Sequence, residues 1–577
     1  MGSGARASSR RWLWLVLAVV VIGVLAWCTV SVMRAARAAE TLRSDVQVAA
    51  GYARGMQTVQ LADTVPAVAA SAEEFSGAVS GPLWSVMARL PVVGSTAGSA
   101  QELAAASLAM SQAAEDLAPA LRTMEPDSIR GTDGAINLAA LDELAEALVA
   151  VQPELREAAD RAAAADSGAI GPVGDAVATA QDQLGDLPAV ADGAVAAMQL
   201  AQVLLGGEGR QRWAVLLQNG SEARGTGGFL GAYTLLDTDE GRIDVTVVDT
   251  NNSLTTPIPN RDMPKDFLEL WTREYTSEWN SYNLSRHFPY TGQLTFNGME
   301  ARGTPIDNVL AMDAHVVAAL LAGTGPITAA GETIDATNAE RFFNADVYAR
   351  YPDVAQKDAV VVELMTALMD RVTSGSFDLP AALSEIVPAA GQGRMLVWSA
   401  DDEVQARLEQ YDVAGVVPRE SGPWVATALN NSAANKLDAF VASSVDYQAA
   451  TCGTGVSAVT VTLTNNAPDP ATSPDSEAYS NFYYEGGDLG NTRMWTAVYG
   501  PVGAEFVKAT INGKRQYVNE GQERGHPVWR WNLDIPRGES AELVVTFNES
   551  PSDDSALVSP QAMAVPQVVS TAQPPCS

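Results

Sequence analysis

The hydrophobic pattern begins with one long apolar run near the N-terminus. Between Arg11 and Arg34, the 22 residues from Trp12 to Met33 carry no formal charge. As a helix they would span about 33 Å, enough to cross a hydrocarbon core of about 30 Å. A buried core helix rarely stays apolar on every face for this length. The run therefore predicts a transmembrane helix, with residues 1–33 forming a cytoplasmic tail and a signal anchor.

The charges on the two sides of this run leave its orientation nearly balanced. Arginines without an acid precede it, which suits a cytoplasmic end, but arginines also follow it. The long acidic body and its cysteine pair favour an extracytoplasmic location for everything after the anchor. A cleaved signal peptide is one alternative, with Ala36-Arg37-Ala38 as its cleavage site, although such apolar stretches usually have only about 7–15 residues. A lipoprotein box at 25–28 is the other, and it is disfavoured by the bulky Trp27.

From 34 to 209 the apolar positions recur at alternating steps of four and three. One such stripe consists of Leu42, Val46, Ala49, Ala53 and Met56. This spacing is typical of the seam between packed helices. Pro153 and Pro188 are expected to kink or split their helices, and Gly81 to Gly98 to form a connecting loop. The segment 34–209 thus predicts a helical stalk or bundle, which is either a spacer or a docking surface for a partner.

From residue 210 apolar strands alternate with helices. Strands are predicted at 213–218, 229–236, 243–248, 306–312 and 395–399. Helices are predicted at 338–348 and 354–372, and two more begin at the N-caps Asp313 and Asp401. Residues 210–432 are therefore expected to form an α/β or α+β ligand domain.

From residue 433 strands follow one another without helices. Residues 456–464 alternate with a period of two, and further strands are predicted at 494–499, 505–511, 528–533 and 541–547. This pattern predicts a β-sandwich over 433–550. The final residues, 551–577, are rich in Pro, Ser and Ala and predict an extended tail.

Composition and charge narrow the classes of partner. A chain of 577 residues is too long for one core, so several domains are expected. The net charge of −33 argues against nucleic acid, whose phosphates require a basic surface. Cationic partners and divalent ions are compatible with this charge, and so is a surface that is simply solvated.

The cysteines and histidines give little support to a metal site. Cys28 lies in the anchor, which leaves Cys452 and Cys576 in the body. A distant pair of this kind favours a disulfide over a metal site, with two unpaired thiols as the alternative. The three histidines are scattered, so no zinc cluster is predicted, and no cofactor is evident.

A glycine-rich segment, 219–229, lies between the first two strands of the middle domain. Four glycines within it allow backbone amides to approach a ligand, and Arg224 is a candidate clamp for an anion. The alternative is a structural connection in which Glu222 and Arg224 pair with each other. Its spacing fits neither a dinucleotide loop nor a nucleotide-hydrolase phosphate loop.

A second polar cluster, 346–358, precedes an apolar helix. Arg350 and Lys357 are candidate anion contacts there, and Asp353 has the position of an N-cap; solvated helix ends are the alternative. The predicted ligand-binding residues of both segments are Asn219, Glu222, Arg224, Thr226, Gly227, Gly228, Arg350, Asp353 and Lys357. No nucleophile elbow, nucleophile–histidine pair or metal-ligand spacing is present, so the common kinds of hydrolytic catalysis are unsupported.

Several short motifs of the middle domain resemble those of a known family. They are Leu216-Leu217-Gln218-Asn219, Glu222, Arg224, Thr226-Gly227-Gly228-Phe229, Gly323-Thr324-Gly325-Pro326, Asp346-Val347-Tyr348 and Lys357-Asp358. Over about 210–420 the chain looks like a bacterial membrane-anchored family known only as a conserved domain of unknown function. The resemblance implies an N-terminal anchor and an envelope location, and it brings no established activity.

The same region is similar in layout to the LytR–CpsA–Psr phosphotransferases. Those are single-pass proteins that attach lipid-linked glycopolymers to the cell wall with arginines, aspartates and magnesium. The resemblance implies such roles for Arg224, Asp249, Arg350 and Asp353. The later motif of those enzymes is rich in arginine, whereas Gln356-Lys357-Asp358 occupies its place here.

These observations predict a binding or scaffolding protein of the cell envelope. Its partners would be the membrane, through one helix, and either a wall glycopolymer or another envelope protein. The alternative is a glycopolymer phosphotransferase, for which magnesium would be the cofactor. The sequence does not identify the ligand, the oligomeric state or a partner protein.

Overall fold

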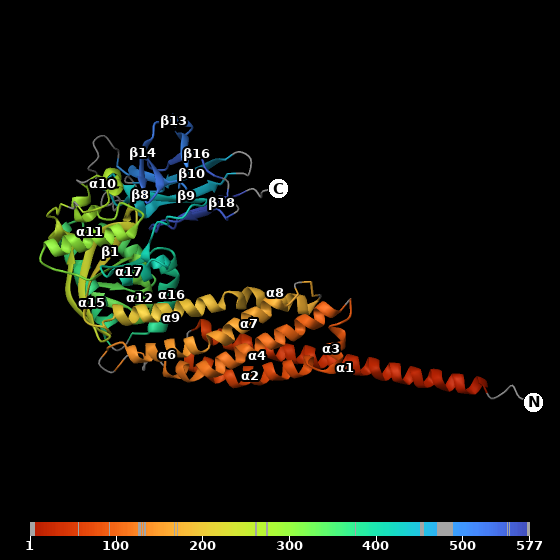
Figure 1. Cartoon of the computed structure of the whole chain (residues 1–577). Helices are drawn as coiled ribbons and strands as arrows, with labels where there is room; N and C mark the ends of the chain where they lie inside the picture. The colour runs from red at the N-terminus through yellow and green to blue at the C-terminus, as the bar shows by residue number, and fades with distance from the viewer. Residues whose placement is uncertain are drawn as a thin grey trace, which may run out of the picture. The chain divides into compact units, whose positions relative to one another are not determined.

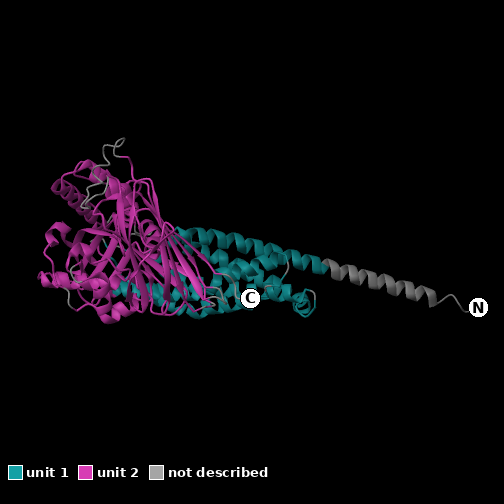
Figure 2. Cartoon of the chain, turned by 90° about the horizontal axis from the view of Figure 1, so that it is seen from above, with its two compact units in different colours: residues 1–131, 136–202 teal, residues 132–135, 203–577 magenta. Residues whose placement is uncertain are grey.

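The computed structural model describes residues 6–573 except 56, 92, 125–128, 130, 132–133, 167, 170, 260–261, 273–274, 375–376, 451–454, 470–488, 551 and 553. Of residues 6–26 and 379–380, only the backbone is described. The chain divides into two compact units, Met1–Gly131 with Ile136–Gln202, and Thr132–Ala135 with Val203–Ser577 (Figure 2). The predicted disulfide between Cys452 and Cys576 lies outside the described residues.

The first unit is α-helical, as predicted. Its helices are α1 (Arg6–Arg54), α2 (Thr58–Val79), α3 (Pro82–Met87), α4 (Gly94–Thr123), α6 (Leu138–Ala150), α7 (Gln152–Ala164), α8 (Pro172–Gly185) and α9 (Leu187–Leu204). Their contacts are made largely by alanines, such as Ala38, Ala97 and Ala104, which pack beside Phe75 and Trp84. Small side chains at these positions let the helices approach closely.

Two prolines of this unit, Pro153 and Pro188, separate helices as predicted. Pro153 lies in the first turn of α7, and Pro188 in the first turn of α9, so each marks a break between two helices. The prediction of a connecting loop from Gly81 to Gly98 is wrong in part, because it contains α3 and the first turn of α4. Pro82 at the start of α3 is compatible with a helix, since the first turn needs no backbone donor there.

The anchor prediction falls mainly on residues whose side chains are outside the described part, and its backbone belongs to α1. Among the described residues, Pro172–Leu204 is long and apolar enough to cross a membrane by length and composition alone. A core helix of a soluble bundle passes the same test.

The second unit begins with a mixed sheet in the order β3-β2-β1-β4-β7. Figure 1 marks its strand β1 beside the helix α11. Its strands are β1 (Gln211–Arg224), β2 (Gly227–Asp239), β3 (Arg242–Thr250), β4 (Asn308–Asp313) and β7 (Met395–Ser399). Strands β1 and β4 are parallel, and the other neighbours are antiparallel. All five strands agree with the prediction, and so do the N-caps Asp313 and Asp401.

Helices cover both faces of this sheet. The helices of this region are α10 (Lys265–Trp271), α11 (Phe288–Ala301), α12 (Ala314–Thr324), α13 (Ala339–Arg341), a π-helix (Phe342–Asp346), α14 (Val347–Arg350), α15 (Val354–Thr373), α16 (Leu379–Gly391) and α17 (Asp402–Leu408). Two short strands, β5 (Ile327–Ala329) and β6 (Glu332–Ile334), pair with each other in a separate sheet. Leu216 of β1 packs in one core with Phe288 of α11, whereas its neighbour Leu217 lies on the face toward α15. Because alternate residues of a strand point to opposite faces, β1 is apolar on both sides.

The C-terminal strands form two further sheets. One has the order β13-β12-β16-β10-β9-β18 and the other β14-β15-β11-β8-β17. Their bounds are β8 (Trp424–Asn431), β9 (Val441–Gln448), β10 (Val456–Asn465), β11 (Thr492–Tyr499), β12 (Glu505–Ile511), β13 (Lys514–Gln516), β14 (Asn519–Glu523), β15 (His526–Ile535), β16 (Ser540–Asn548), β17 (Leu557–Ser559) and β18 (Val568–Ala572).

Strand β8 links the middle region to these sheets. Ala426 and Ala428 belong to the core of the middle sheet, and Val425 and Leu429 to the core of the C-terminal sheets. Although β8 precedes residue 433, it pairs with β11 of the C-terminal part. Two short strands, β17 and β18, form within the segment predicted as an extended tail, because they pair with β8 and β9.

Candidate functional site

The glycine-rich segment is the buried end of a hairpin. Strand β1 continues to Arg224 with an irregularity between Asn219 and Ala223, and β2 begins at Gly227. Only Gly225 and Thr226 separate the two strands. From residue 218 to 228 every residue except Asn219 is buried. The segment is therefore part of the structure's interior.

Glu222 and Arg224 form a buried ion network with Lys436. Arg224 Nη2 lies 2.6 Å from Glu222 Oε1, and Lys436 Nζ contacts Glu222 Oε2. Burial by itself would raise the pKa of Glu222, but Lys436 and Arg224 outweigh it, so the pKa is lowered below its usual range. Arg224 also donates to the carbonyl oxygens of Ala223 and Asn431, at 2.9 and 3.2 Å. The arginine is thus occupied by structural partners.

The same hairpin end joins the middle sheet to the C-terminal sheets. The backbone N–H of Ala223 donates to Asp438 at 2.8 Å, and that of Gly225 donates to the side chain of Asn430 at 3.0 Å. In turn, Gln561 Nε2 donates to the carbonyl of Arg224 at 2.7 Å. These contacts come from residues more than two hundred positions away, and they make the hairpin end a joint within the unit.

Asp438 makes a pH-dependent contribution to the stability of the folded state at this joint. Burial raises its pKa to about 7, whereas an unfolded aspartate titrates near its ordinary value. The folded state thus holds the proton more tightly, so this contribution to stability is complete below about pH 4 and is lost as the pH rises through 7.

We expect Asp438→Asn, which mimics the protonated acid, to remove this dependence. Between about pH 4 and 8 the wild type should lose on the order of 3 kcal/mol of unfolding free energy relative to the variant. Urea unfolding followed by tryptophan fluorescence measures the difference. Asp239→Asn, at the exposed end of β2, is the matched control and should follow the wild type. A constant difference between wild type and Asp438→Asn across this range would contradict the expectation.

The Thr-Gly-Gly segment fixes the side-chain amide of Gln218. Thr226 Oγ1 and Asn283 Nδ2 each donate to Gln218 Oε1 at 3.0 Å. Asn283 Nδ2 also donates to the carbonyl of Gly228 at 2.7 Å, which fixes the orientation of both amides. Gly227 has φ +141°, and a Cβ there would lie only 3.0–3.1 Å from the Gln218 amide. Glycine is favoured at 227 because L side chains rarely adopt this φ, and because the amide of Gln218 packs against its backbone.

Gln218 is one of the residues around a half-open cavity with a volume of about 40 Å³. The cavity lies where the parallel strands β1 and β4 end, beside the π-helix, α14 and the start of α15. This is the edge at which α/β sheets commonly bind ligands. Gln218 is 1% exposed, and no described residue bonds its Nε2. The Oδ1 atom of Asn344, another residue around the cavity, likewise has no hydrogen-bond partner among the described residues, and both atoms are buried in the protein.

Two of the predicted site residues, Asn219 and Lys357, meet in this cavity. Asn219 Nδ2 donates to the hydroxyl of Tyr348 and to the carbonyl of Phe343, the latter at 3.4 Å. Lys357 Nζ lies 2.5 Å from Asp358 Oδ1 and 5.7 Å from the centre of the Tyr348 ring. The lysine side chain is 21% exposed, so its remaining donors are accessible.

Asp358 is held in this wall by β3 and the chain after it. Thr250 Oγ1 donates to Asp358 at 3.3 Å, and Asn252 Nδ2 donates to the same oxygen. Lys357 balances the charge of the carboxylate, and the two hydrogen bonds hold the carboxylate in place. The cavity wall therefore carries a neutral ion pair and several amide groups.

The remaining predicted residues lie elsewhere. Arg350 forms an ion pair with Glu332 at 2.5 Å and is half exposed. Asp353 caps α15 by accepting from the backbone of Gln356 at 2.9 Å, as predicted. Neither these two residues nor Glu222 and Arg224 line the cavity.

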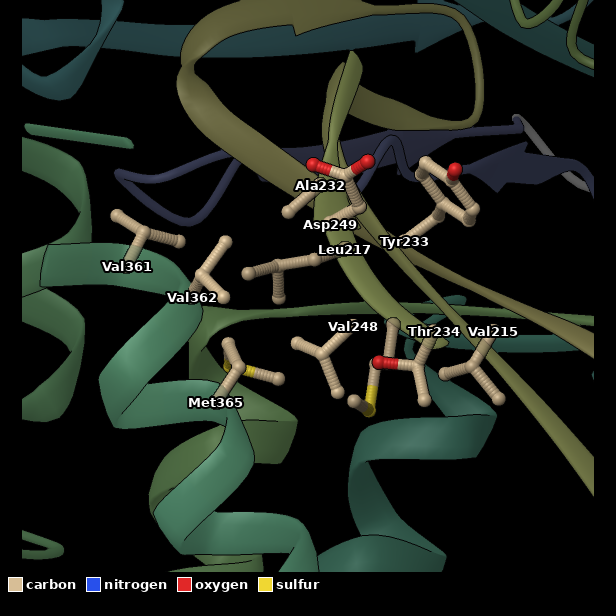
Figure 3. A pocket seen from close by; sticks show the side chains of 11 residues that line it. Val215, Leu217, Ala232, Tyr233, Thr234, Val248, Asp249, Val361, Val362 and Met365 are labelled. Atoms are coloured by element: carbon tan, nitrogen blue, oxygen red, sulfur yellow. The ribbon is translucent and has the colours of Figure 1, made fainter. Parts of the chain in front are cut away.

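A narrow apolar slit continues the cavity along α15 (Figure 3). Figure 3 shows Val361, Val362 and Met365 of α15 facing Leu217 of β1 and Val248 of β3. Its volume is about 10 Å³. Leu217, Ala232 and Val361 line both spaces, so the cavity is apolar where it meets the slit. Asp249 lies at this slit and accepts from its neighbour Thr250 at 2.7 Å.

Sequence reasoning missed Gln218, Asn344 and Tyr348 as site residues. The available signal was a polar pair, Gln218-Asn219, at the end of an apolar strand within the motif of the family resemblance. No cluster of three or more His, Cys, Asp or Glu side chains that would hold a metal ion occurs among the described residues.

The fold and the cavity define a mixed α/β domain with a small cavity, joined to C-terminal sheets. Residues 208–348 match the model of a family described as "Protein of unknown function (DUF4012)". The predicted resemblance to a conserved domain of unknown function is therefore confirmed. The searches of curated proteins and of solved structures both returned no match.

Proposed function

We propose that this chain is a single-pass, extracytoplasmic binding protein of the cell envelope. The observation that carries this proposal is the half-open cavity where β1 and β4 end, in which the partly exposed Lys357 lies beside Asn219 and Tyr348. The ammonium group of Lys357 has three N–H donors, and it pairs with Asp358. A ligand with an acceptor group would bond the remaining donors, which is the reason for assigning the cavity to binding.

In this proposal the helical region separates the ligand domain from the membrane. The two C-terminal sheets form a β-sandwich that supports the ligand domain and offers a surface to an envelope partner. The ion network of Glu222, Arg224 and Lys436 keeps the ligand domain and the sheets together. A cavity held on such a rigid body is preorganised for binding.

A glycopolymer phosphotransferase remains the alternative proposal. It requires cations that meet a pyrophosphate, and Arg224 and Arg350 were the candidates. Arg224 is buried against Glu222 and two backbone carbonyls, and Arg350 is paired with Glu332. These contacts support a structural role for the arginines and leave Lys357 as the cation beside the cavity.

One experiment on whole cells tests both location and binding. Protease added from outside to cells with an opened wall should degrade the body and leave an anchor fragment. Soluble cell-wall fragments added first should slow this digestion, because a bound ligand stabilises the folded state. Lys357→Met should lose this protection, whereas Lys508→Met, at an exposed position of β12, should keep it.

Complete resistance of the body in the absence of fragments, with the wall opened, would contradict the extracytoplasmic location. Protection that is equal in wild type and Lys357→Met would place the binding site outside the cavity. The first result would contradict the proposed location, and the second would contradict the proposed binding site.

A further inference from the structure

Two acidic side chains of the C-terminal part are buried at its joint with the middle sheet. Asp438, in the short 3-10 helix Leu437–Phe440, and Glu523, in β14, are each 0% exposed. Both accept hydrogen bonds from the middle region, so both link the two parts of the unit. Among the described residues, neither carboxyl forms an ion pair with a basic group. A buried acid without a cation takes up a proton more readily than an exposed one.

Asp438 receives its hydrogen bonds on one oxygen only. The backbone N–H of Ala223 and the side-chain amide of Asn431 donate to Oδ2 at 2.8 and 2.9 Å. The other oxygen, Oδ1, is buried and has no hydrogen-bond partner among the described residues. Ionisation would therefore place charge on a buried oxygen that receives no hydrogen bond. Burial is the main cause that raises the pKa of Asp438 to about 7.

The ionisable groups around Asp438 belong to the hairpin end and its surroundings. Glu222 raises the pKa of Asp438 and Arg224 lowers it, and both effects are smaller than that of burial. The others are Lys436, which is held by Glu222, and Tyr348, which packs beside the 3-10 helix. None of these four groups bonds to Asp438 directly, so the carboxyl keeps its burial cost when it ionises.

Glu523 is held by donors from both parts of the joint. Trp271 Nε1 of α10 donates to Oε2 at 2.7 Å, and Ser285 Oγ donates to Oε1 at 2.6 Å. The hydroxyl of Tyr499, in β11, also donates to Oε1, at 3.0 Å. Burial raises the pKa of Glu523 to about 7 and outweighs these three bonds, which lower it. The nearby Asp266 adds to the rise.

The other ionisable groups around Glu523 are Arg286, His287, Tyr290, Arg524 and His526. The guanidinium groups of Arg286 and Arg524 donate to backbone carbonyls. Burial lowers the pKa of His287 and raises that of Tyr290, so both side chains are neutral near pH 7. The ring nitrogens of His526 lie against two further backbone carbonyls. No group of this set forms an ion pair with Glu523.

We propose that Asp438 and Glu523 form a pH switch that controls the contact between the middle sheet and the C-terminal sheets. The joint is closed while both carboxyls are protonated, and their ionisation favours an opened state in which water reaches them. In the opened state each acid has its ordinary pKa of about 4. The closed state is therefore favoured most below that pH and loses this advantage as the pH rises through 7. The switch does not depend on which ligand the cavity binds.

Hydrogen exchange followed by mass spectrometry on the full-length chain in detergent tests this switch at pH 6 and pH 8. Peptides that cover 218–230 and 280–290 report on the joint, and a peptide that covers 97–110 of α4, in the first unit, is the reference. Each carboxyl should raise the equilibrium constant for opening about tenfold between the two pH values. After correction for the intrinsic exchange rate, the protection factors of both joint peptides should fall about a hundredfold. The reference peptide should keep its protection factor.

Variants that mimic the protonated acids assign the effect to its residues. Asp438→Asn and Glu523→Gln should each leave about a tenfold fall, and the double variant should show none. Because one opening exposes both carboxyls, each single variant should reduce the fall in both joint peptides. Glu505→Gln, at an exposed position of β12, is the matched control and should keep the full fall.

Equal protection at pH 6 and pH 8 in the joint peptides of the wild type would overturn the switch, and this measurement needs no variant to fold. A fall of the same size in the reference peptide would also overturn it, because the effect would then not belong to the joint. So would a double variant that keeps the wild-type fall. If each variant changed only the peptide that contacts its own carboxyl, the two acids would act separately, and a single switch would be wrong.

Discussion

Gly228→Ala is expected to destabilise the second unit by about 3 kcal/mol or more, which lowers its Tm by roughly 6 °C. A Cβ at this position would lie 2.2 Å from the carbonyl carbon and oxygen of Asn219 and 2.6 Å from the backbone nitrogen of Gly220. These are backbone atoms of the irregular part of β1, which pairs with β2 at this point. They cannot rotate away as a side chain would, so the hairpin end must shift as a whole.

Gly231→Ala is the matched control in the same strand. Its Cβ would meet no described atom closer than 3.8 Å, which is ordinary contact, and its φ lies outside the positive range. Thermal unfolding of both variants, followed by tryptophan fluorescence, measures the effect. A Gly228→Ala protein as stable as Gly231→Ala would show that the hairpin end is not packed as described.

Most regular elements of the second unit were predictable from sequence. Strands such as β1, β4 and β10 have apolar or alternating patterns that depend only on local residue type. The N-caps Asp313, Asp353 and Asp401 predict where their helices begin, because capping is a local interaction. Strand β8 was not predicted, because its alanines and asparagines become a strand only through pairing with β11.

The glycine-rich segment shows why a motif does not define its role. Glycines let a backbone approach a ligand or another part of the protein equally well. At Gly225 the neighbours are the backbone atoms of Leu284 and Ser285, about sixty residues away. No spacing within 219–229 indicates that distant segment. The alternative of a Glu222–Arg224 pair was open from the sequence, and it is what the structure contains.

The cavity was predictable only in part for the same reason. Asn219 and Lys357 were proposed as ligand residues, and both line it. The side-chain amide of Gln218 is oriented by a hydrogen bond from Asn283, which lies 65 residues later in the sequence. Asn344 lies on a π-helix that sequence reasoning assigned to a continuous helix over 338–348. Long-range contacts and this irregular turn, more than residue type, decide which residues surround the cavity.

Arg224→Ala is expected to cost about 3–5 kcal/mol of unfolding free energy, the range for breaking a buried ion pair. The substitution leaves Glu222 with Lys436 alone and removes the donors to the carbonyls of Ala223 and Asn431. Arg224→Lys should recover little of this free energy. An ammonium group lacks the planar fork of donors with which the guanidinium group reaches all three acceptors. Arg350→Ala, at a half-exposed ion pair, is the control and should cost about 0–1 kcal/mol.

The same variants separate a structural arginine from an anion clamp when inorganic pyrophosphate is added. A structural Arg224 predicts that pyrophosphate leaves the Tm of the wild type unchanged, while Arg224→Ala lowers the Tm with or without it. A clamp predicts the reverse, with a wild-type Tm that rises with pyrophosphate and an Arg224→Ala protein of normal stability that no longer responds. The burial of Arg224 and its contact with Glu222 lead us to expect the first outcome. The second would restore the phosphotransferase and move its site from the cavity to the hairpin end.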